Sequence, residues 1–261
     1  MKKSRSFDHA ADIYDKTRLL SGAAADAGIR SLLDAAGQDA RILEVGTGTG
    51  RISIPLLERD ADLIGCDLSA LMMMRQRDKY PTVRLVQSDA VFLPFPDGHF
   101  DALLTVHVMH LVGPWREALR EFKRILRAGG VFLNVRTYET VGESIRWQMR
   151  DHWRSWLKTN GVEIRHPGAQ DEEQVRAELQ RMGAQWKEVE VVRFTNRYSL
   201  HLQLERYAGR IFSDTWSIPE DLYQASLDEL RSWVEREYGD FDAEREDTVR
   251  FVYDAAYFDA Q

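Results

Sequence analysis

Residues 41–50 place a short apolar run that ends in an acid directly before three glycines at alternating positions. Gly46, Gly48 and Gly50 lack a Cβ, so a turn built from them can take positive φ and bring its N–H groups close to a ligand. The apolar-periodic stretch from Ile52 predicts a helix that adds unpaired N–H donors and a positive dipole end. The segment therefore predicts a strand, a tight turn and a helix start around a nucleotide-like cofactor, with an ordinary glycine-rich turn as the alternative.

The residues that follow repeat the strand signal at the spacing of βαβ units. A second strand over 61–67 ends in Asp67, where an acid can accept hydrogen bonds from both ribose hydroxyls of a nucleotide. A third strand over 83–90 runs into Ser88-Asp89-Ala90, and a fourth over 100–110 is nearly all apolar, as expected of a strand buried on both faces. After a helix end and a Gly129-Gly130 turn, a fifth strand reaches residue 135. This alternation predicts an α/β fold.

These motifs resemble, in order and spacing, those of class I S-adenosylmethionine-dependent methyltransferases. They are the glycine segment 44–50, Asp67, the triplet 88–90 and the turn 126–130. Within that superfamily the chain is most similar to the small-molecule branch related to the ubiquinone/menaquinone methyltransferases, over about residues 7–135. The resemblance implies S-adenosyl-L-methionine as the cofactor. It also implies a doubly wound, mostly parallel seven-stranded sheet with helical lid insertions, in which the sixth and seventh strands pair antiparallel at one edge.

The resemblance also implies roles for individual residues. The loop 46–50 would pack against the methionine and ribose part of the cofactor, Asp67 would hold the ribose hydroxyls, and Asp89 would meet the adenine amino group beside Ala90. The cofactor-binding residues implied in this way are Tyr14, Arg18, Glu44, Gly46, Thr47, Gly48, Gly50, Asp67, Leu68, Ser88, Asp89, Ala90 and His107.

An N-terminal helix over about 6–20 is predicted from the helical spacing of Phe7, Ala10, Tyr14 and Arg18, with Ser6 as its cap. In the resembled family this segment folds over the cofactor. Tyr14 would then shield the site, and Arg18 would pair with the methionine carboxylate, for which a bidentate guanidinium is well suited. The alternative is a solvated amphipathic helix with Tyr14 in the core.

Composition limits the class of protein. The chain has 261 residues, 44% of them hydrophobic, and a formal charge of −7, which does not favour a nucleic-acid partner. No apolar run approaches the roughly 20 residues that span a bilayer, and the first residues do not form a signal peptide, so we expect a cytoplasmic protein without membrane insertion. The single cysteine, Cys66, is expected to be a buried thiol, and no Cys/His spacing predicts a metal site. The sequence predicts no particular oligomeric state.

Beyond residue 135 the pattern changes to helices rich in tryptophan and arginine. We expect one methyltransferase domain over 1–261, with a core at about 28–135, 170–195 and 247–258 and helical lid insertions at about 139–168 and 199–240. Aromatic side chains of the insertions are candidates to line an apolar or aromatic acceptor pocket, with ordinary packing as the alternative. They are Trp147, Trp153, Trp156, Tyr207, Phe212 and Trp216.

The sequence leaves the catalytic residues undetermined. His107 and His110 at the end of the fourth strand are weak candidates for a general base, and a structural role is the alternative. The predicted activity is methyl transfer from S-adenosylmethionine to a small-molecule acceptor. A protein that binds S-adenosylmethionine or S-adenosylhomocysteine without catalysis and a nicotinamide-dependent oxidoreductase remain as alternatives, because binding motifs and chemistry are separable.

Overall fold

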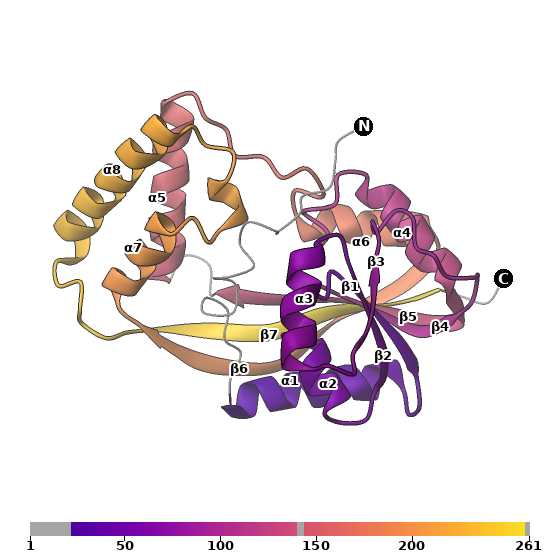
Figure 1. Cartoon of the computed structure of the whole chain (residues 1–261). Coiled ribbons are helices and arrows are strands. Elements are labelled where there is room, and N and C mark those ends of the chain that lie inside the picture. The colour runs from indigo at the N-terminus through magenta and orange to yellow at the C-terminus, as the bar shows by residue number, and fades with distance from the viewer. Residues whose placement is uncertain (1–21, 140–143, 259–261) are drawn as a thin grey trace. The chain divides into compact units, whose positions relative to one another are not determined.

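A computed structural model describes residues 22–139 and 144–258 of the chain, which form a seven-stranded sheet in the order β3-β2-β1-β4-β5-β7-β6 (Figure 1). The pairs β1–β2, β1–β4, β2–β3 and β4–β5 are all parallel. The predicted doubly wound, mostly parallel sheet is confirmed. The elements are α1 (Gly22–Ala36), β1 (Arg41–Val45), α2 (Ser53–Leu57), β2 (Asp62–Asp67), α3 (Ala70–Lys79), β3 (Arg84–Gln87), β4 (Phe100–Val106), α4 (Trp115–Ile125), β5 (Leu126–Glu139), α5 (Ile145–Thr159), α6 (Glu172–Arg181), β6 (Ala184–Tyr198), α7 (Leu200–Ala208), η3 (Ser213–Thr215), α8 (Glu220–Tyr238) and β7 (Arg245–Phe258).

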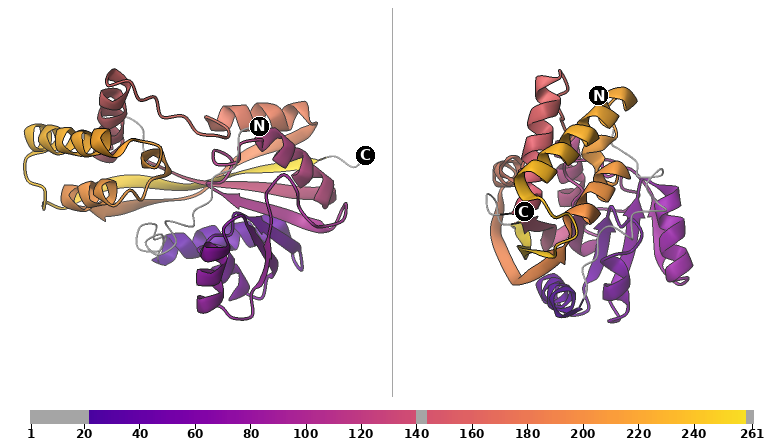
Figure 2. Two further views of the ribbon diagram at one scale, coloured as in Figure 1. Left: turned by 45° about the horizontal axis from the view of Figure 1, so that its top comes forward. Right: turned by 90° about the vertical axis from the view of Figure 1, so that its left-hand side faces the viewer.

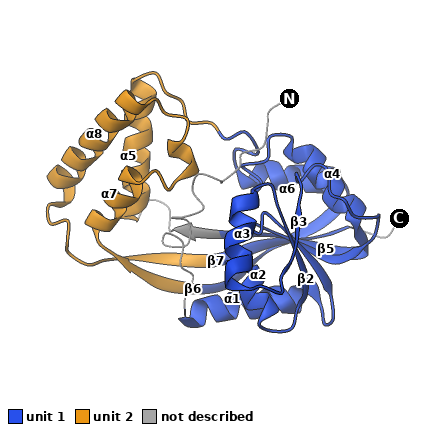
Figure 3. Cartoon of the chain, viewed as in Figure 1, with its two compact units in different colours: residues 1–136, 166–192, 251–261 blue, residues 137–165, 193–250 orange. Residues whose placement is uncertain are grey.

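The chain divides into two compact units (Figure 3). Unit 1 comprises residues 1–136, 166–192 and 251–261, and unit 2 comprises residues 137–165 and 193–250. The helices of unit 2 are α5, α7 and α8. That these segments act as a lid stays a prediction, and the predicted helix over 6–20 lies outside the described residues.

In unit 1, helices cover both faces of the sheet because successive residues of each buried strand point to opposite faces. Leu43 and Val45 of β1 belong to one core, to which α4 and α6 contribute, whereas Ile42 belongs to a second core with α1 and α2. Figure 1 shows α4 and α6 on one side of the sheet and α1 and α2 on the other. By this alternation Glu44 falls on the same face as Ile42.

The Gly129-Gly130 pair corrects one prediction. The expected turn before the fifth strand lies inside β5, since Leu126 pairs with Phe100 and Val131 already pairs with Ala102. Gly129 has φ +74°, and a Cβ on Gly130 would lie 2.9 Å from the Arg127 carbonyl oxygen. Residues 127–130 stand opposite Asp101 alone, so the Gly-Gly turn lies inside the assigned strand and interrupts the ladder.

Two predicted strands are shorter than expected. β3 ends at Gln87 instead of Ala90, because the Asp89 carboxylate accepts a hydrogen bond from the Val91 amide at 3.3 Å and starts a turn. β4 ends at Val106 instead of His110, because His107 takes φ +55° and leaves the extended conformation.

A buried ion network joins β5, α6, β6 and β7 inside unit 1. Arg136 donates to Asp254 at 2.5 Å, and Arg176 holds the same carboxylate with two nitrogens at 2.9 and 3.0 Å. Glu188 accepts from both arginines. The side chains of Arg136 and Asp254 are 4% and 1% exposed, so each charge depends on the others for compensation.

Unit 2 has its own core between α5, α7 and α8, which lie together in both views of Figure 2. Trp153 is 1% exposed and donates from its indole nitrogen to the Ser226 hydroxyl at 3.0 Å. Trp156 packs against this core, Trp216 donates to the Arg210 carbonyl at 2.8 Å, and Trp147 is 37% exposed. α5 and α7 begin directly after Ser144 and Ser199, because each serine hydroxyl accepts a hydrogen bond from a backbone amide in the first turn of its helix.

We predict that Asp254→Ala destabilises the protein by about 3–5 kcal/mol, because it leaves two arginines beside a buried site without their shared carboxylate. The control is Glu173→Ala, which removes a 76% exposed partner of the same Arg176 and should cost no more than about 0.5 kcal/mol. Urea unfolding of both variants measures the difference. Equal losses of stability would contradict the role of the network.

Candidate cofactor site

The glycine segment forms a tight turn at the carboxyl end of β1. Gly46, Gly48 and Gly50 have φ values of +77°, +57° and +88°, a conformation that side chains with a Cβ rarely adopt. A Cβ on Gly46 would lie 2.3 Å from Val108, and one on Gly50 would lie 2.6 Å from Ile54. At Gly48 the nearest side-chain atom would be 3.4 Å away. Gly46 and Gly50 are thus required by packing inside the protein, and Gly48 is required by its positive φ. Gly46 is partly exposed, whereas Gly48 and Gly50 are buried.

The helix after this turn is shorter than the sequence suggests. α2 spans only Ser53–Leu57, and no side chain caps its first turn. Its dipole therefore contributes little, because the effect is confined to the end of a sustained helix. What the turn offers a ligand is chiefly its own backbone.

Asp67 ends β2 directly beside this turn. Val45 and Cys66 lie opposite each other in the parallel register, so the next residues, Gly46 and Asp67, are neighbours at the same sheet edge. The Asp67 carboxylate accepts the Gly48 amide at 2.8 Å and the Ser69 amide at 2.8 Å. These two bonds orient the carboxylate at the sheet edge.

A buried polar network holds the turn from below. The Thr47 hydroxyl lies 3.2 Å from the Glu44 carboxyl, 2.9 Å from the Ser53 hydroxyl and 3.1 Å from the Gln76 side-chain oxygen. Gln76 also donates to Ser53 at 2.7 Å. Ser53 belongs to α2 and Gln76 belongs to α3, so the network holds both helices against the turn. Ser53 and Gln76 were not predicted from the sequence, because neither belongs to a local motif.

Glu44 is 1% exposed, and its side chain faces this network. Burial raises its pKa to about 8, while hydrogen bonds from Ser53 and Thr47 lower it in part. At neutral pH the carboxyl is therefore mostly protonated. In the structure its contact is with Thr47, and a contact with a cofactor stays a prediction.

The third loop of this edge follows β3. The Ser88 amide donates to the Asp67 carbonyl at 3.1 Å, which fixes the loop 88–90 to the end of β2, and Gln87 donates to the Leu68 carbonyl at 3.1 Å. Ala90 is 7% exposed and belongs to the core shared with α4. Asp67 is the last residue of β2, and Asp89 comes just after the end of the neighbouring strand β3. The sequence predicts such an arrangement for two acids that bind one ligand.

The loop after β4 carries the predicted histidines. The His107 amide donates to the Val135 carbonyl at 3.2 Å, and the His110 ring meets the His166 ring edge-on with centroids 4.8 Å apart. Gly168 donates to the His110 carbonyl at 2.9 Å, and a Cβ there would lie 2.2 Å from the Met109 carbonyl. The segment 166–169 thus clamps this loop. His166 had no distinguishing context in the sequence.

Because β1 to β4 are parallel neighbours, their carboxyl ends bring most of the predicted residues to one edge. Glu44, Gly46, Thr47, Gly48, Gly50, Asp67, Leu68, Ser88, Asp89, Ala90, His107 and His110 lie in or beside these strand ends. Tyr14 and Arg18 lie outside the described residues. Cys66 is buried, as predicted, and burial raises the pKa of its thiol to about 12.

Across residues 22–139 and 144–258, no three acidic, histidine or cysteine side chains come together as a metal site would need. In the same ranges no helix has the length and apolar content to cross a membrane.

Sequence comparison identifies the domain that carries this edge. The methyltransferase domain family matches residues 43–134. Demethylmenaquinone methyltransferase of Beutenbergia cavernae is 35% identical over 127 residues, which are 48% of this chain and 53% of that protein. The enzyme of the same name from Thermus thermophilus is 37% identical over 133 residues, covering 48% of this chain and 60% of that protein. The matches thus span little more than half the length of these relatives.

A third relative and two solved structures extend the comparison. Fatty-acid O-methyltransferase of Mycolicibacterium smegmatis is 41% identical over 97 residues, 36% of this chain and 35% of that protein. The YcgJ protein of Bacillus subtilis is similar in structure with a TM-score of 0.59 at 16% identity, covering 90% of this chain and all of that one. Phosphoethanolamine N-methyltransferase 2 of Haemonchus contortus, solved with S-adenosyl-L-methionine, gives a TM-score of 0.52 at 15% identity over 97% of this chain and 57% of that one. At these identities the structures show the fold.

We predict that Glu44→Gln gains stability relative to the wild type as pH rises from about 5 to 8. The folded protein keeps a proton on Glu44 that the unfolded chain loses near the ordinary glutamate pKa of 4.5, so wild-type stability falls over this window, by up to about 1.4 kcal/mol per pH unit. Glutamine does not titrate and escapes this loss. Urea unfolding at several pH values measures the difference, with the exposed Glu58→Gln as control. A pH-independent difference would contradict a protonated Glu44.

Proposed function

We propose that this protein, which carries a class I methyltransferase domain over residues 43–134, binds S-adenosylmethionine at the carboxyl edge of β1 to β4 and transfers its methyl group to a small-molecule acceptor. The observation that carries the proposal is the bond between Gly48 and Asp67. It fixes a ribose-type acceptor beside the glycine turn.

The chemistry of the edge fits the cofactor. The Asp67 carboxylate is suited to accept hydrogen bonds from two vicinal hydroxyls, and the glycine turn beside it offers a backbone contact at the partly exposed Gly46. Ala90 offers an apolar contact for adenine, and Asp89 would accept a hydrogen bond from the adenine amino group. We also propose that Tyr14 and Arg18 close this site. A nicotinamide cofactor would use the same Asp67, but the loop 88–90 would then have no role.

Bound S-adenosylmethionine supplies an electrophilic methyl group on a sulfonium. The protein then contributes mainly alignment and exclusion of water, because a methyl transfer needs no more than one proton removed from the acceptor. His107 and His110 lie on the loop beside the glycine turn, and His166 orients the His110 ring through their edge contact. We propose His107 and His110 as the candidates to take up such a proton.

The acceptor is proposed to be a small molecule. The relatives named above act, by their names, on demethylmenaquinone and on fatty acids. The chain has a formal charge of −7, which is unfavourable for a phosphate-rich nucleic acid. These points support a metabolite-sized acceptor for this protein as well.

The direct test incubates the full chain with methyl-labelled S-adenosylmethionine and a metabolite extract. We expect the label to appear in one or a few small molecules, and the labelled product identifies the acceptor. The heat-denatured protein is the control. Cofactor binding without any transfer of label would instead support a non-catalytic binding protein.

We predict that Asp67→Ala weakens S-adenosylmethionine binding by about 1.5–3 kcal/mol, the usual range for hydrogen bonds to a charged group. Asp62→Ala is the matched control, because Asp62 lies at the opposite end of the same strand and is 45% exposed. Calorimetric titration of both folded variants measures the affinities. Unchanged affinity in Asp67→Ala would remove Asp67 from the site.

A further inference from the structure

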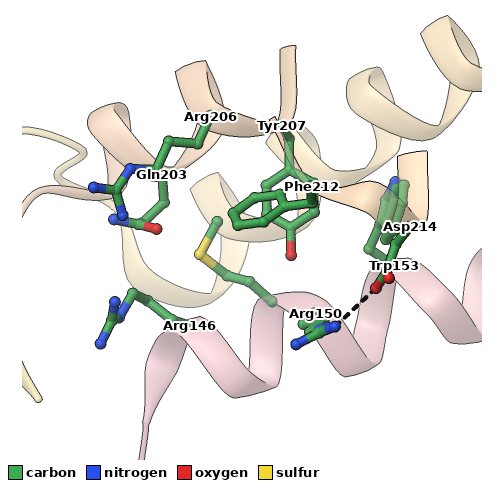
Figure 4. A pocket seen from close by; sticks show the side chains of 9 residues that line it. Arg146, Arg150, Trp153, Gln203, Arg206, Tyr207, Phe212 and Asp214 are labelled. Atoms are coloured by element: carbon green, nitrogen blue, oxygen red, sulfur yellow. Dashed lines mark hydrogen bonds and ion pairs between the residues drawn. The ribbon is translucent and has the colours of Figure 1, made fainter. Parts of the chain in front are cut away.

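Unit 2 contains a pocket of its own between α5, α7 and the segment that leads into η3 (Figure 4). Its volume is about 90 Å³ for the centres of water molecules. At about 30 Å³ for each water, this is room for about three waters, so a larger ligand would extend out of the open side of the pocket. All of its lining residues belong to unit 2.

One side of this pocket is apolar. Met149 and Trp153 from α5 and Tyr207 from α7 line it together with Phe212, and the Trp153 and Tyr207 rings meet edge-on at 5.2 Å. Phe212 lies against Tyr207 at 5.0 Å between ring centroids. Three of the aromatic candidates from the sequence therefore line one pocket, although Trp153 also belongs to the core. This wall suits an aromatic or branched apolar group.

The polar side of the pocket is basic. Arg146, Arg150 and Arg206 line it, against a single lining acid, Asp214. Asp214 is shared by Arg150 at 2.8 Å and by Arg154. Burial raises the pKa of Asp214, but the two arginines outweigh it and hold the pKa well below its usual range, so this acid is charged and committed to them.

Arg146 is held by a second carboxylate. Its Nε donates to Asp247 at 2.6 Å, and Asp247 also accepts from the Tyr198 and Ser144 hydroxyls at 3.1 and 2.8 Å. Three arginines and one acid thus line the pocket, in a chain whose formal charge is −7.

Gln203 supplies a second, independent observation. It lines the pocket, is only 4% exposed, and its side-chain nitrogen has no acceptor within the described ranges. Figure 4 shows this amide on the same side of the pocket as Arg146 and Arg206. A buried N–H donor without an acceptor is costly, so such a donor in a pocket points to an acceptor that arrives with the ligand.

We propose that this pocket binds a small organic carboxylate, with the carboxylate toward Gln203, Arg206 and Arg146 and the apolar body against the aromatic wall. A carboxylate accepts from planar donors such as a guanidinium and an amide, and its negative charge suits a lining of three arginines and one acid. This binding does not depend on the proposed function.

Benzoate is the probe, and benzamide is its neutral counterpart of the same size. We expect the full chain to bind benzoate with a dissociation constant of about a millimolar or below, and benzamide at least about fivefold more weakly. Calorimetry or ligand-observed NMR measures both. S-adenosylmethionine affinity is determined in the same samples, so a failure of this proposal and a failure of the cofactor assignment are separate results.

Three variants locate the probe. Arg206→Gln and Gln203→Met should each weaken benzoate binding by about tenfold or more, because each removes a donor to a charged group. The control Arg236→Gln removes the same charge from the 62% exposed Arg236 of α8 and should change binding by less than about twofold. Gln203→Met should melt no lower than the wild type, because the lost nitrogen has no acceptor among the described residues.

The proposal is overturned if benzoate does not bind, if benzamide binds equally well, or if Arg206→Gln and Arg236→Gln have the same effect.

Discussion

The hydrogen bond from the Gly48 amide to the Asp67 carboxylate is the constraint on which the cofactor edge depends. It joins the turn after β1 to the end of β2, and the Ser88 amide in turn bonds to the Asp67 carbonyl. Three loops are therefore fixed to one residue. The geometry needs positive φ at the glycines and a buried support below them, which Thr47 provides through its bonds to Glu44, Ser53 and Gln76.

The residues that make the turn rigid are different from the residues that we propose to bind the ligand. The protonated carboxyl of Glu44 and the hydroxyls around it satisfy one another inside the protein, so the turn is preorganised before any ligand arrives. The partly exposed Gly46 and Asp67 are the groups that we propose to contact the ligand. In unit 2 the division is similar, since Trp153 and Asp214 are held by internal partners while Gln203 has a donor without one among the described residues.

The sequence predicts what is encoded locally. The glycine turn, Asp67 and the parallel strand order follow from short motifs whose spacing matches one βαβ unit after another. The support under the turn does not, because Ser53 and Gln76 come from separate helices that meet only in the fold. β5 is assigned from Leu126, before the Gly-Gly turn, because Leu126 already pairs with Phe100, and such long-range pairing is not visible in a local motif. The basic pocket is not predictable in this way, since arginines spaced four apart on α5 are typical of a solvated helix face, and their shared acid lies some 60 residues away.

The central claim is that this edge is built for S-adenosylmethionine. Its most direct measurement is a calorimetric comparison of S-adenosylmethionine, S-adenosylhomocysteine and NAD⁺ with the full chain. The account predicts that the two sulfur-containing nucleosides bind at one site per chain and compete with each other, while NAD⁺ gives no saturable heat. Saturable binding of NAD⁺ with none of S-adenosylmethionine would contradict it.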